Sequence, residues 1–401
     1  MSLTSAALVS VLAFLAPLFV RLTRVPLPDI VVQIGLGVLV GPQVLGWASV
    51  DEPVQVLSVI GLSFLLFLAG FEIDFERLRG RTARLAITAF GLSFALAFAI
   101  GGILGATHLV QSPLLIAIIL AATALGVIIP VLKDSGEIDS PVGRLVLAGA
   151  SIAEVVPVVL LSLLFSEQTH DLGAKIGLLA AFSALVVAAG LAILGLERWP
   201  WISNALLALQ DTTAEIRVRA AVALLMGFAA LATQFGLEAI LGAFLAGATI
   251  SLLDRDPGKT HALFRTKLEA VGFGAFIPYF FISAGMTLDL RSFADHATTL
   301  VRVPIFLTAI LVARAVPTLL YRSQLANRAQ TLAAGLLQST TLSIPIVGGS
   351  IGVHLSLIQP ENYVALVLAG LLSVISFPVL ADLLLRADNA STGRTASISP
   401  K

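Results

Sequence analysis

One acidic residue stands alone in a long apolar segment. Glu154 lies in the run LVLAGASIAEVVPVVLLSLLF, thirteen positions after Pro141 and twelve before Ser166, with no other charge within a helical turn. A carboxyl group at such a depth in hydrocarbon costs several kcal/mol or more, so it is usually retained for function. A buried carboxylate that holds either a proton or a metal cation, but not both, can exchange one for the other. The alternative is a neutral structural Glu hydrogen-bonded to a neighbouring helix.

Two further apolar segments combine hydroxyl side chains with a proline downstream. IILAATALGVIIPVLKD carries Thr123 before Pro130, and AAGLLQSTTLSIPIVGGSIGV carries a cluster at 338–341 before Pro345. Proline removes a backbone donor and frees carbonyl groups, which is tolerated at membrane depth only where protein or a water-filled cavity covers them. Polar interruptions of this kind in two halves of a chain point to a transport site. Proline kinks of purely structural origin are the alternative.

Arg314 is the basic residue placed deepest in an apolar segment, VPIFLTAILVARAVPTLLYR. It could offset the carbonyl dipoles of broken helices or pair with a carboxylate. It could also be an arginine that extends partly toward the membrane surface and binds backbone carbonyls. Ser151, close to one turn before Glu154, could supply a ligand oxygen or merely pack helices.

Composition places these residues in a membrane. Of 401 residues, 58% are hydrophobic and only 12% are charged, and the mean hydropathy is +1.00. Runs of about 18 or more apolar residues are candidate membrane helices, since about 20 residues at 1.5 Å rise cross the hydrocarbon. Thirteen runs meet this description, at 5–20, 28–47, 53–72, 84–107, 113–132, 141–165, 173–196, 216–234, 237–253, 270–289, 299–321, 331–358 and 362–385.

The distribution of basic residues predicts the topology. Twenty of the 24 Lys and Arg residues fall in alternate connections and the C-terminal tail. By the positive-inside rule we expect an inner or plasma membrane protein with its N-terminus outside and its C-terminus in the cytoplasm. The polar tail from 387 to 401 is expected to be disordered.

Several function classes are excluded. Cysteine is absent, which removes disulfides, thiol catalysis and Cys-ligated clusters. Basic and acidic residues balance at 24 each, so no charge excess attracts nucleic acid. The chain also lacks phosphate-binding and dinucleotide-binding fingerprints. We therefore expect no enzyme and no cofactor, but a lipid-embedded protein driven by an ion gradient.

Five stretches have the order and spacing of a known family. They are LPDIVVQIGLGVLVGPQVLG at 27–46, FLLFLAGFEIDFERLRGR at 64–81, ATALGVIIPVLKDSG at 122–136, GAFLAG at 242–247 and FFISAGMTLDL at 280–290. Through them nearly the whole chain resembles the Kef-type members of the monovalent cation:proton antiporter-2 group. The resemblance implies an all-α, thirteen-helix, inverted-repeat antiporter fold with two crossing discontinuous helices.

The resemblance also implies an organisation into parts and a homodimer. Helices in 1–83 and 211–295 would form a dimerisation scaffold, those in 84–170 and 296–386 would form a core, and 171–210 would link them. In the family an acid on the sixth helix binds the ion after Asn, Gln or Asp; here the pair is Ala153-Glu154. Without a second polar group, electroneutral exchange is favoured. The nucleotide-binding module of the glutathione-gated members is expected to be missing.

The residues and the resemblance together predict a secondary transporter that exchanges Na⁺ or K⁺ for H⁺. Glu154 would be the shared site, and Arg314 would compensate charge at the helix crossing. The further cation ligands are expected to be Thr123, Ser151, Gln338, Ser339, Thr340 and Thr341. Two alternatives stay open: a sodium-coupled organic-anion carrier of the same architecture, and a non-transporting membrane sensor or channel.

Overall fold

The computed structural model is helical throughout the residues that it describes, which are 3–23, 28–73, 80–107, 109–165, 172–197, 215–253, 261–288 and 300–392. Within these residues, ten helices or helix pairs are long and apolar enough to cross a membrane, and each coincides with an expected span. The other three expected spans contain the apolar helical segments Asp29–Val40, Ile176–Val186, which is part of the longer helix α8 (Leu172–Glu197), and Ala239–Leu252. The prediction of a polytopic all-α membrane protein is confirmed, with about ten spans rather than thirteen established by length.

The chain divides into two compact units, each built from two separate stretches. Unit 1 comprises Met1–Ile73 and Val158–Thr287, and unit 2 comprises Asp74–Pro157 and Leu288–Lys401. The scaffold, linking and core roles expected of parts of the chain stay predictions.

Unit 1 is a set of closely packed helices, and its packing depends on small residues. α3 packs against α11 and α13, α10 packs against α11, and α13 packs against α2. Glycines lie at these contacts: a Cβ on Gly37 would collide with the carbonyl of Ile282, and one on Gly247 with that of Phe67. Lipid chains are as apolar as the helix surfaces, so the hydrophobic effect does not drive helices together in a membrane. Small residues allow the close backbone packing that stabilises their association instead. The helices are α1 (Thr4–Thr23), α2 (Asp29–Val40), α3 (Glu52–Phe71), α8 (Leu172–Glu197), α10 (Ile216–Gln234), α11 (Ala239–Leu253), α12 (His261–Val271), the π-helical η1 (Gly272–Phe276) and α13 (Ile277–Met286).

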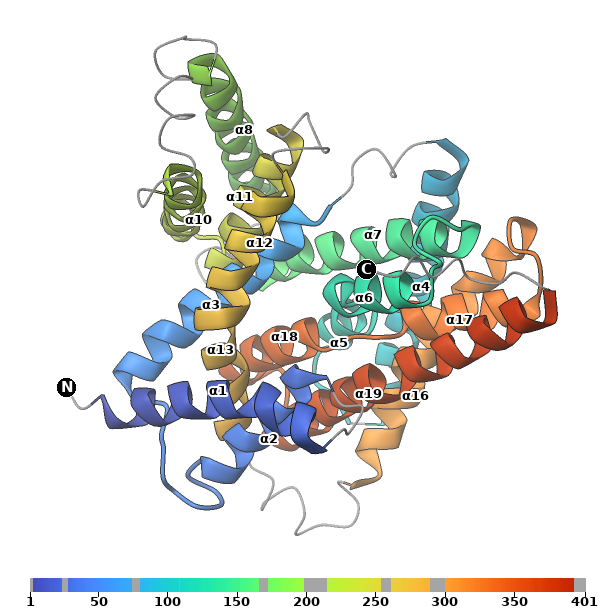
Figure 1. Ribbon diagram of the computed structural model, residues 1–401, viewed down its shortest axis with the longest axis horizontal. Coiled ribbons are helices and arrows are strands. Elements are labelled where there is room, and N and C mark those ends of the chain that lie inside the picture. The colour runs from blue at the N-terminus through green and yellow to red at the C-terminus, as the bar shows by residue number, and fades with distance from the viewer. Residues whose placement is uncertain are drawn as a thin grey trace. The chain divides into compact units, whose positions relative to one another are not determined.

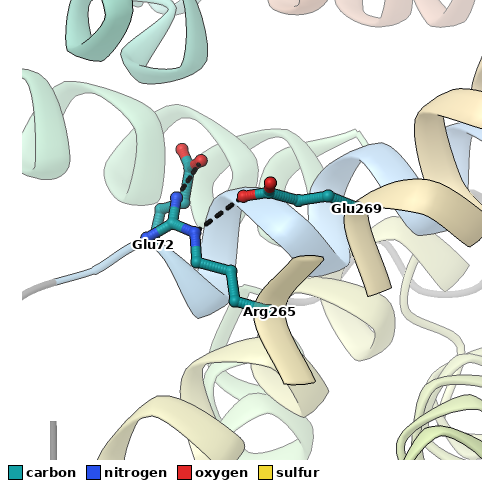
Figure 2. A network of polar contacts seen from close by, with 3 residues as sticks. All are labelled: Glu72, Arg265 and Glu269. Carbon is teal, nitrogen blue, oxygen red and sulfur yellow. Dashed lines mark hydrogen bonds and ion pairs between the residues drawn. The ribbon is translucent and has the colours of Figure 1, made fainter. Parts of the chain in front are cut away.

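An ion-pair network joins two helices of unit 1. Arg265, on α12, donates from Nη2 to Glu72, the C-cap residue that follows α3, and from Nε to Glu269 one turn along its own helix, both at 2.7 Å (Figure 2). The Arg265 side chain is 32% exposed, so solvent screens part of the attraction. The contact ties the end of α3 to α12.

Unit 2 contains two interrupted helices. α5 (Pro113–Leu120) stops before α6 (Leu125–Asp134), and α17 (Arg328–Gln338) stops before α18 (Ser343–His354). We call the intervening residues 121–124 the first break and 339–342 the second break. In Figure 1 α5 lies beside α18, with which it packs. The flanking elements are α4 (Gly80–Ala106), α7 (Pro141–Leu164, in unit 2 up to Pro157), α16 (Arg302–Ala315), the 3₁₀ segment η2 (Val316–Ser323) and α19 (Pro360–Thr392).

The start of the expected tail is helical. α19 continues to Thr392, so the prediction of disorder is wrong for 387–392, while 393–401 lie outside the described residues. The reason is Asp388, which is buried and accepts hydrogen bonds from the side-chain amides of Asn327 and Gln330. Its carboxylate thereby holds the end of α19 against the start of α17.

Candidate functional site

The two breaks of unit 2 meet through a backbone hydrogen bond. The N–H of Ala124, in the first break, donates to the carbonyl of Thr340, in the second, at 2.8 Å. A helix interruption leaves backbone groups without their usual partners, and in a membrane these must be satisfied by protein. Each break therefore provides part of the hydrogen bonding that the other has lost.

A third helix joins the first break beside the isolated acid. The N–H of Thr123 donates to the carbonyl of Ala153, the residue before Glu154, at 3.4 Å. In a regular helix this carbonyl would accept from residue 157, which is Pro157 and has no N–H. Pro157 therefore leaves the carbonyl of Ala153 free, and Thr123 in the first break supplies its donor. This hydrogen bond joins α7 to the first break one residue before Glu154.

Arg314 lies at the junction of the breaks and is 3% exposed. Its guanidinium donates from Nε and Nη2 to Oγ1 of Thr123, at 2.9 and 2.7 Å, and from Nη1 to the hydroxyl of Ser93 on α4, at 3.0 Å. Nε also donates to the backbone carbonyl of Gln338 at 3.2 Å, and Nη2 donates to its Oε1. The ring of Phe90 lies 5.9 Å from the guanidinium carbon, within cation–π range.

The acceptors of these five hydrogen bonds are all neutral oxygens. One of them is the carbonyl of Gln338, the last residue of α17, where the helix dipole places partial negative charge. The bond to this carbonyl is common to two interpretations open from the sequence, an arginine that offsets the carbonyl end of a broken helix and an arginine that binds backbone carbonyls.

The second break is held from α19. The hydroxyl of Ser373 accepts from the N–H of Thr341 at 3.1 Å and lies 3.0 Å from its carbonyl, to which it can donate. That carbonyl precedes Pro345 by four residues, so the proline cannot serve it. The hydroxyl also lies 2.7 Å from the carbonyl of Gly370, so two carbonyls share its single proton, while its oxygen satisfies the N–H of Thr341 inside the break.

Glu154 is buried in the middle of α7, with 9% of its surface exposed. Ser151, one turn earlier, is also buried and its hydroxyl donates to the carbonyl of Leu147 at 2.9 Å, which leaves its lone pairs for acceptor contacts. α7 therefore presents a carboxyl group and a hydroxyl oxygen in the segment that reaches the first break.

The residues selected from the sequence fall into three sets. Thr123, Gln338 and Arg314 lie in direct contact. Ser339 and Thr340 donate their hydroxyls back along α17, and Oγ1 of Thr341 is buried with no hydrogen-bond partner among the described residues. Glu154 and Ser151 share α7, which reaches the first break through Ala153.

Other residues of the site were not selected from the sequence. Ser93, Gly149, Tyr321 and Ser373 contribute contacts that only the tertiary arrangement shows, because each is an ordinary small or aromatic residue in an apolar run. Pro157 had a usable signal: a proline three positions after a buried acid frees the carbonyl beside it.

An all-helical membrane protein in which two interrupted helices meet around buried polar side chains has the architecture of a secondary transporter. Residues 10–386 match the family model described as the transmembrane sodium/hydrogen exchanger, and the chain belongs to this family. It is therefore a member of a family of membrane antiporters rather than of enzymes.

Curated relatives carry consistent names. The putative Na⁺/H⁺ antiporter YjbQ of Bacillus subtilis is 30% identical over 94% of this chain, which spans 62% of that protein's length. A Na⁺/H⁺ antiporter of Enterococcus hirae is 28% identical, with 89% of this chain and 91% of the relative covered. The glutathione-regulated potassium-efflux protein KefC of Escherichia coli is 24% identical over 95% of this chain, which spans 60% of that relative.

A solved structure supports the fold. The sodium proton antiporter MjNhaP1 of Methanocaldococcus jannaschii superposes with a TM-score of 0.61 at 16% identity, with 96% of each chain covered. At this identity the similarity establishes the architecture and leaves the chemistry to the residues of this chain.

Proposed function

We propose that the protein is a secondary-active antiporter that exchanges Na⁺ or K⁺ for H⁺ across an inner or plasma membrane. The observation that carries the proposal is Glu154, a carboxyl group buried in the middle of a membrane helix and adjacent to the carbonyl that binds the first break. Such a group is retained at this depth for function. The names of the relatives and the family support the same transport class.

The exchange is proposed to be electroneutral, one cation for one proton. Glu154 binds either H⁺ or a monovalent cation, and both loaded forms have the same charge. Ala153 offers no second carboxylate to carry an additional proton. The hydrogen-bond acceptors of Arg314 are neutral hydroxyl and amide oxygens, which do not titrate. The net charge around the guanidinium is therefore the same in both loaded forms.

The cation ligands beside Glu154 are proposed to come from hydroxyl oxygens that keep acceptor capacity. This condition is met by Ser151, Ser339, Thr340 and Thr341, because among the described residues the first three hydroxyls act as donors to backbone carbonyls and the fourth has no hydrogen-bond partner. Thr123 and Gln338 differ from these residues, because Oγ1 of Thr123 and Oε1 of Gln338 already accept hydrogen bonds from Arg314. We assign these two residues to holding the arginine, because a cation and a guanidinium compete for the same oxygens.

We further propose alternating access in which the helices of 84–170 and 296–386 carry Glu154 past a scaffold formed by 1–83 and 211–295, in a homodimer. The N-terminus is assigned to the outside and the C-terminus to the cytoplasm. Because the chain has no cysteine, single introduced thiols test the orientation directly. Ser49→Cys is expected to react with an impermeant reagent from outside and Asp139→Cys from inside; the reverse would overturn the assignment, and cross-linking in membranes tests the dimer.

The central test uses proteoliposomes that contain a pH-sensitive dye. Adding Na⁺ or K⁺ should dissipate a preset ΔpH, and a series of Li⁺, Na⁺, K⁺ and Rb⁺ should identify the transported ion. Glu154→Gln removes the titratable group with little change of shape and should abolish the signal, while Glu361→Gln, at the start of α19, should leave it intact. Full activity of Glu154→Gln would remove Glu154 from the mechanism.

Stoichiometry needs a separate measurement. The membrane potential is clamped with K⁺ and valinomycin and Na⁺-driven exchange is recorded at several potentials. A one-for-one exchange moves no net charge and should be insensitive to the potential. Exchange driven by the potential alone would exclude electroneutrality while leaving antiport itself in place.

A further inference from the structure

Gln338 uses both ends of its side-chain amide in the interior of unit 2. Oε1 accepts from Nη2 of Arg314, and Nε2 donates to the backbone carbonyl of Val146 on α7 at 2.8 Å. Its main-chain carbonyl also accepts from Thr123 at 2.6 Å. The residue is 2% exposed, so no water replaces these contacts. Gln338 thus connects the arginine, the first break and the helix that carries Glu154.

The surface of α7 is open where the amide lies. A Cβ on Gly149 would collide with Nε2 of Gln338 and would lie 2.7 Å from the hydroxyl of Tyr321. A small cavity lined by Gly149, Arg314, Tyr321 and Gln338 adjoins the contact. Only a residue without a side chain lets the amide reach the helix backbone at this point.

α7 is therefore held at two levels, and both lead to Arg314. Gln338 binds Val146, eight residues or about 12 Å of helix before Glu154. Thr123 binds Ala153, the residue directly before Glu154. Both Thr123 and Gln338 accept hydrogen bonds from the guanidinium. The arginine is thereby linked to the position of Glu154 through Thr123 and Gln338.

We propose that Gln338 is a positioning residue for exchange: it couples Arg314 to α7, seated on Gly149, and so sets the place of Glu154 relative to the two breaks. This inference rests on the proposed function. In this proposal Gln338 positions Glu154 and does not coordinate the cation. Loss of the coupling should weaken cation binding while the conformational cycle continues.

The test is a double-mutant cycle between Gln338→Ala and Gly149→Ala, measured as cation-dependent ΔpH dissipation in proteoliposomes. Each single variant should raise the apparent KM for the transported cation about tenfold and keep Vmax within about twofold. If Gly149 serves to seat the amide, the added methyl costs nothing once the amide is gone. The double variant should then match Gln338→Ala rather than reach about a hundredfold.

A matched control separates the seat from helix packing in general. Gly91 lies inside α4 of the same unit, and a Cβ there would meet nothing within 4 Å. Gly91→Ala should leave KM unchanged. The positioning role would be overturned by any of three results: a wild-type KM for Gly149→Ala, additive effects in the double-mutant cycle, or a fall of Vmax at constant KM.

A second variant covers the case in which Gln338→Ala does not reach the membrane. In Gln338→Glu, the carboxylate still accepts from Arg314 but cannot donate to the carbonyl of Val146. The same rise of KM is expected, and a wild-type KM would overturn the inference. Wild-type vesicles without cation-dependent exchange would refute the proposed function itself, whereas active wild type with additive variants would refute only the role of Gln338.

Discussion

Thr123 provides the sharpest test of how the first break is held together. Thr123→Val keeps the shape of the side chain and removes one hydroxyl. That hydroxyl donates to the carbonyl of Gln338 and accepts from two nitrogens of Arg314, at 2.6, 2.9 and 2.7 Å. Thr123 is 1% exposed, so solvent cannot replace the lost partner.

The expected destabilisation depends on which nitrogen atoms of Arg314 keep an acceptor in Thr123→Val. Nε of Arg314 still reaches the carbonyl of Gln338, and Nη2 still reaches its Oε1. The net loss is therefore about one hydrogen bond to a charged group, roughly 1.5–3 kcal/mol, plus one neutral bond of roughly 0.5–1.5 kcal/mol. We expect about 3 kcal/mol. For a unit of about 200 residues this corresponds to a lowering of Tm by about 6–12 °C.

The assay is thermal unfolding of the purified protein in detergent at one scan rate, because membrane proteins often unfold irreversibly. Thr123→Ser keeps the hydroxyl and should lie near the wild type, apart from the small cost of one lost methyl group. Thr88→Val is the control: Thr88 is exposed on α4 and its hydroxyl bonds only to carbonyls of its own helix.

A Tm of Thr123→Val within about 2 °C of Thr88→Val would refute the reasoning. It would mean that Arg314 is held without this hydroxyl, and that the contacts described at the first break are interchangeable with others. An equal loss in Thr123→Ser and Thr123→Val would also contradict it, since it would assign the effect to packing rather than to hydrogen bonding.

Three further outcomes follow from the same structure. Pro157→Ala restores an N–H that competes for the carbonyl of Ala153, so the cation KM should rise while Tm stays level or increases; an unchanged KM would contradict the role of that carbonyl. Ser373→Ala leaves the buried N–H of Thr341 in the second break without its acceptor and should cost about 2 kcal/mol, measured through Tm. Ser376→Ala should cost little, because that hydroxyl bonds along its own helix. Equal losses in the two variants would contradict a role of Ser373 in holding the second break. Arg265→Gln should lower the free energy of unfolding by about 1 kcal/mol. In 1 M salt its difference in Tm from the wild type should shrink, because salt screens exposed ion pairs. A difference that does not depend on salt would show that packing and not charge stabilises the contact.

Hydropathy was sufficient to predict most of the fold. Apolar runs of membrane-spanning length are a strong signal, and ten of them are helices of that length in the described residues. The two interruptions were also predictable, because Thr123 and the cluster at 339–341 are polar and precede prolines. The breaks coincide with the hydroxyl residues and not with the prolines, which lie inside the following helices.

The partners at the site could not be predicted in the same way. Arg314 was a candidate for charge compensation, but its acceptors are separated from it by up to 221 residues in the chain. Helical periodicity reports only on neighbours three or four positions apart. Residue type alone also gave Thr123 and Gln338 the same role as Ser151, although two of the three are occupied by the guanidinium.

The shared hydrogen bonds of the two breaks have a consequence for biogenesis. Thr123 enters the membrane early, yet Arg314 follows 191 residues later and Gln338 215 residues later. At roughly 5–20 residues per second of synthesis, about 10–40 s pass before these partners exist. Among the partners of Thr123 described above, the carbonyl of Ala153 is made within the same part of the chain. The N-terminal stretch of unit 2 is therefore inserted in an incomplete state, and the C-terminal stretch completes its polar interior.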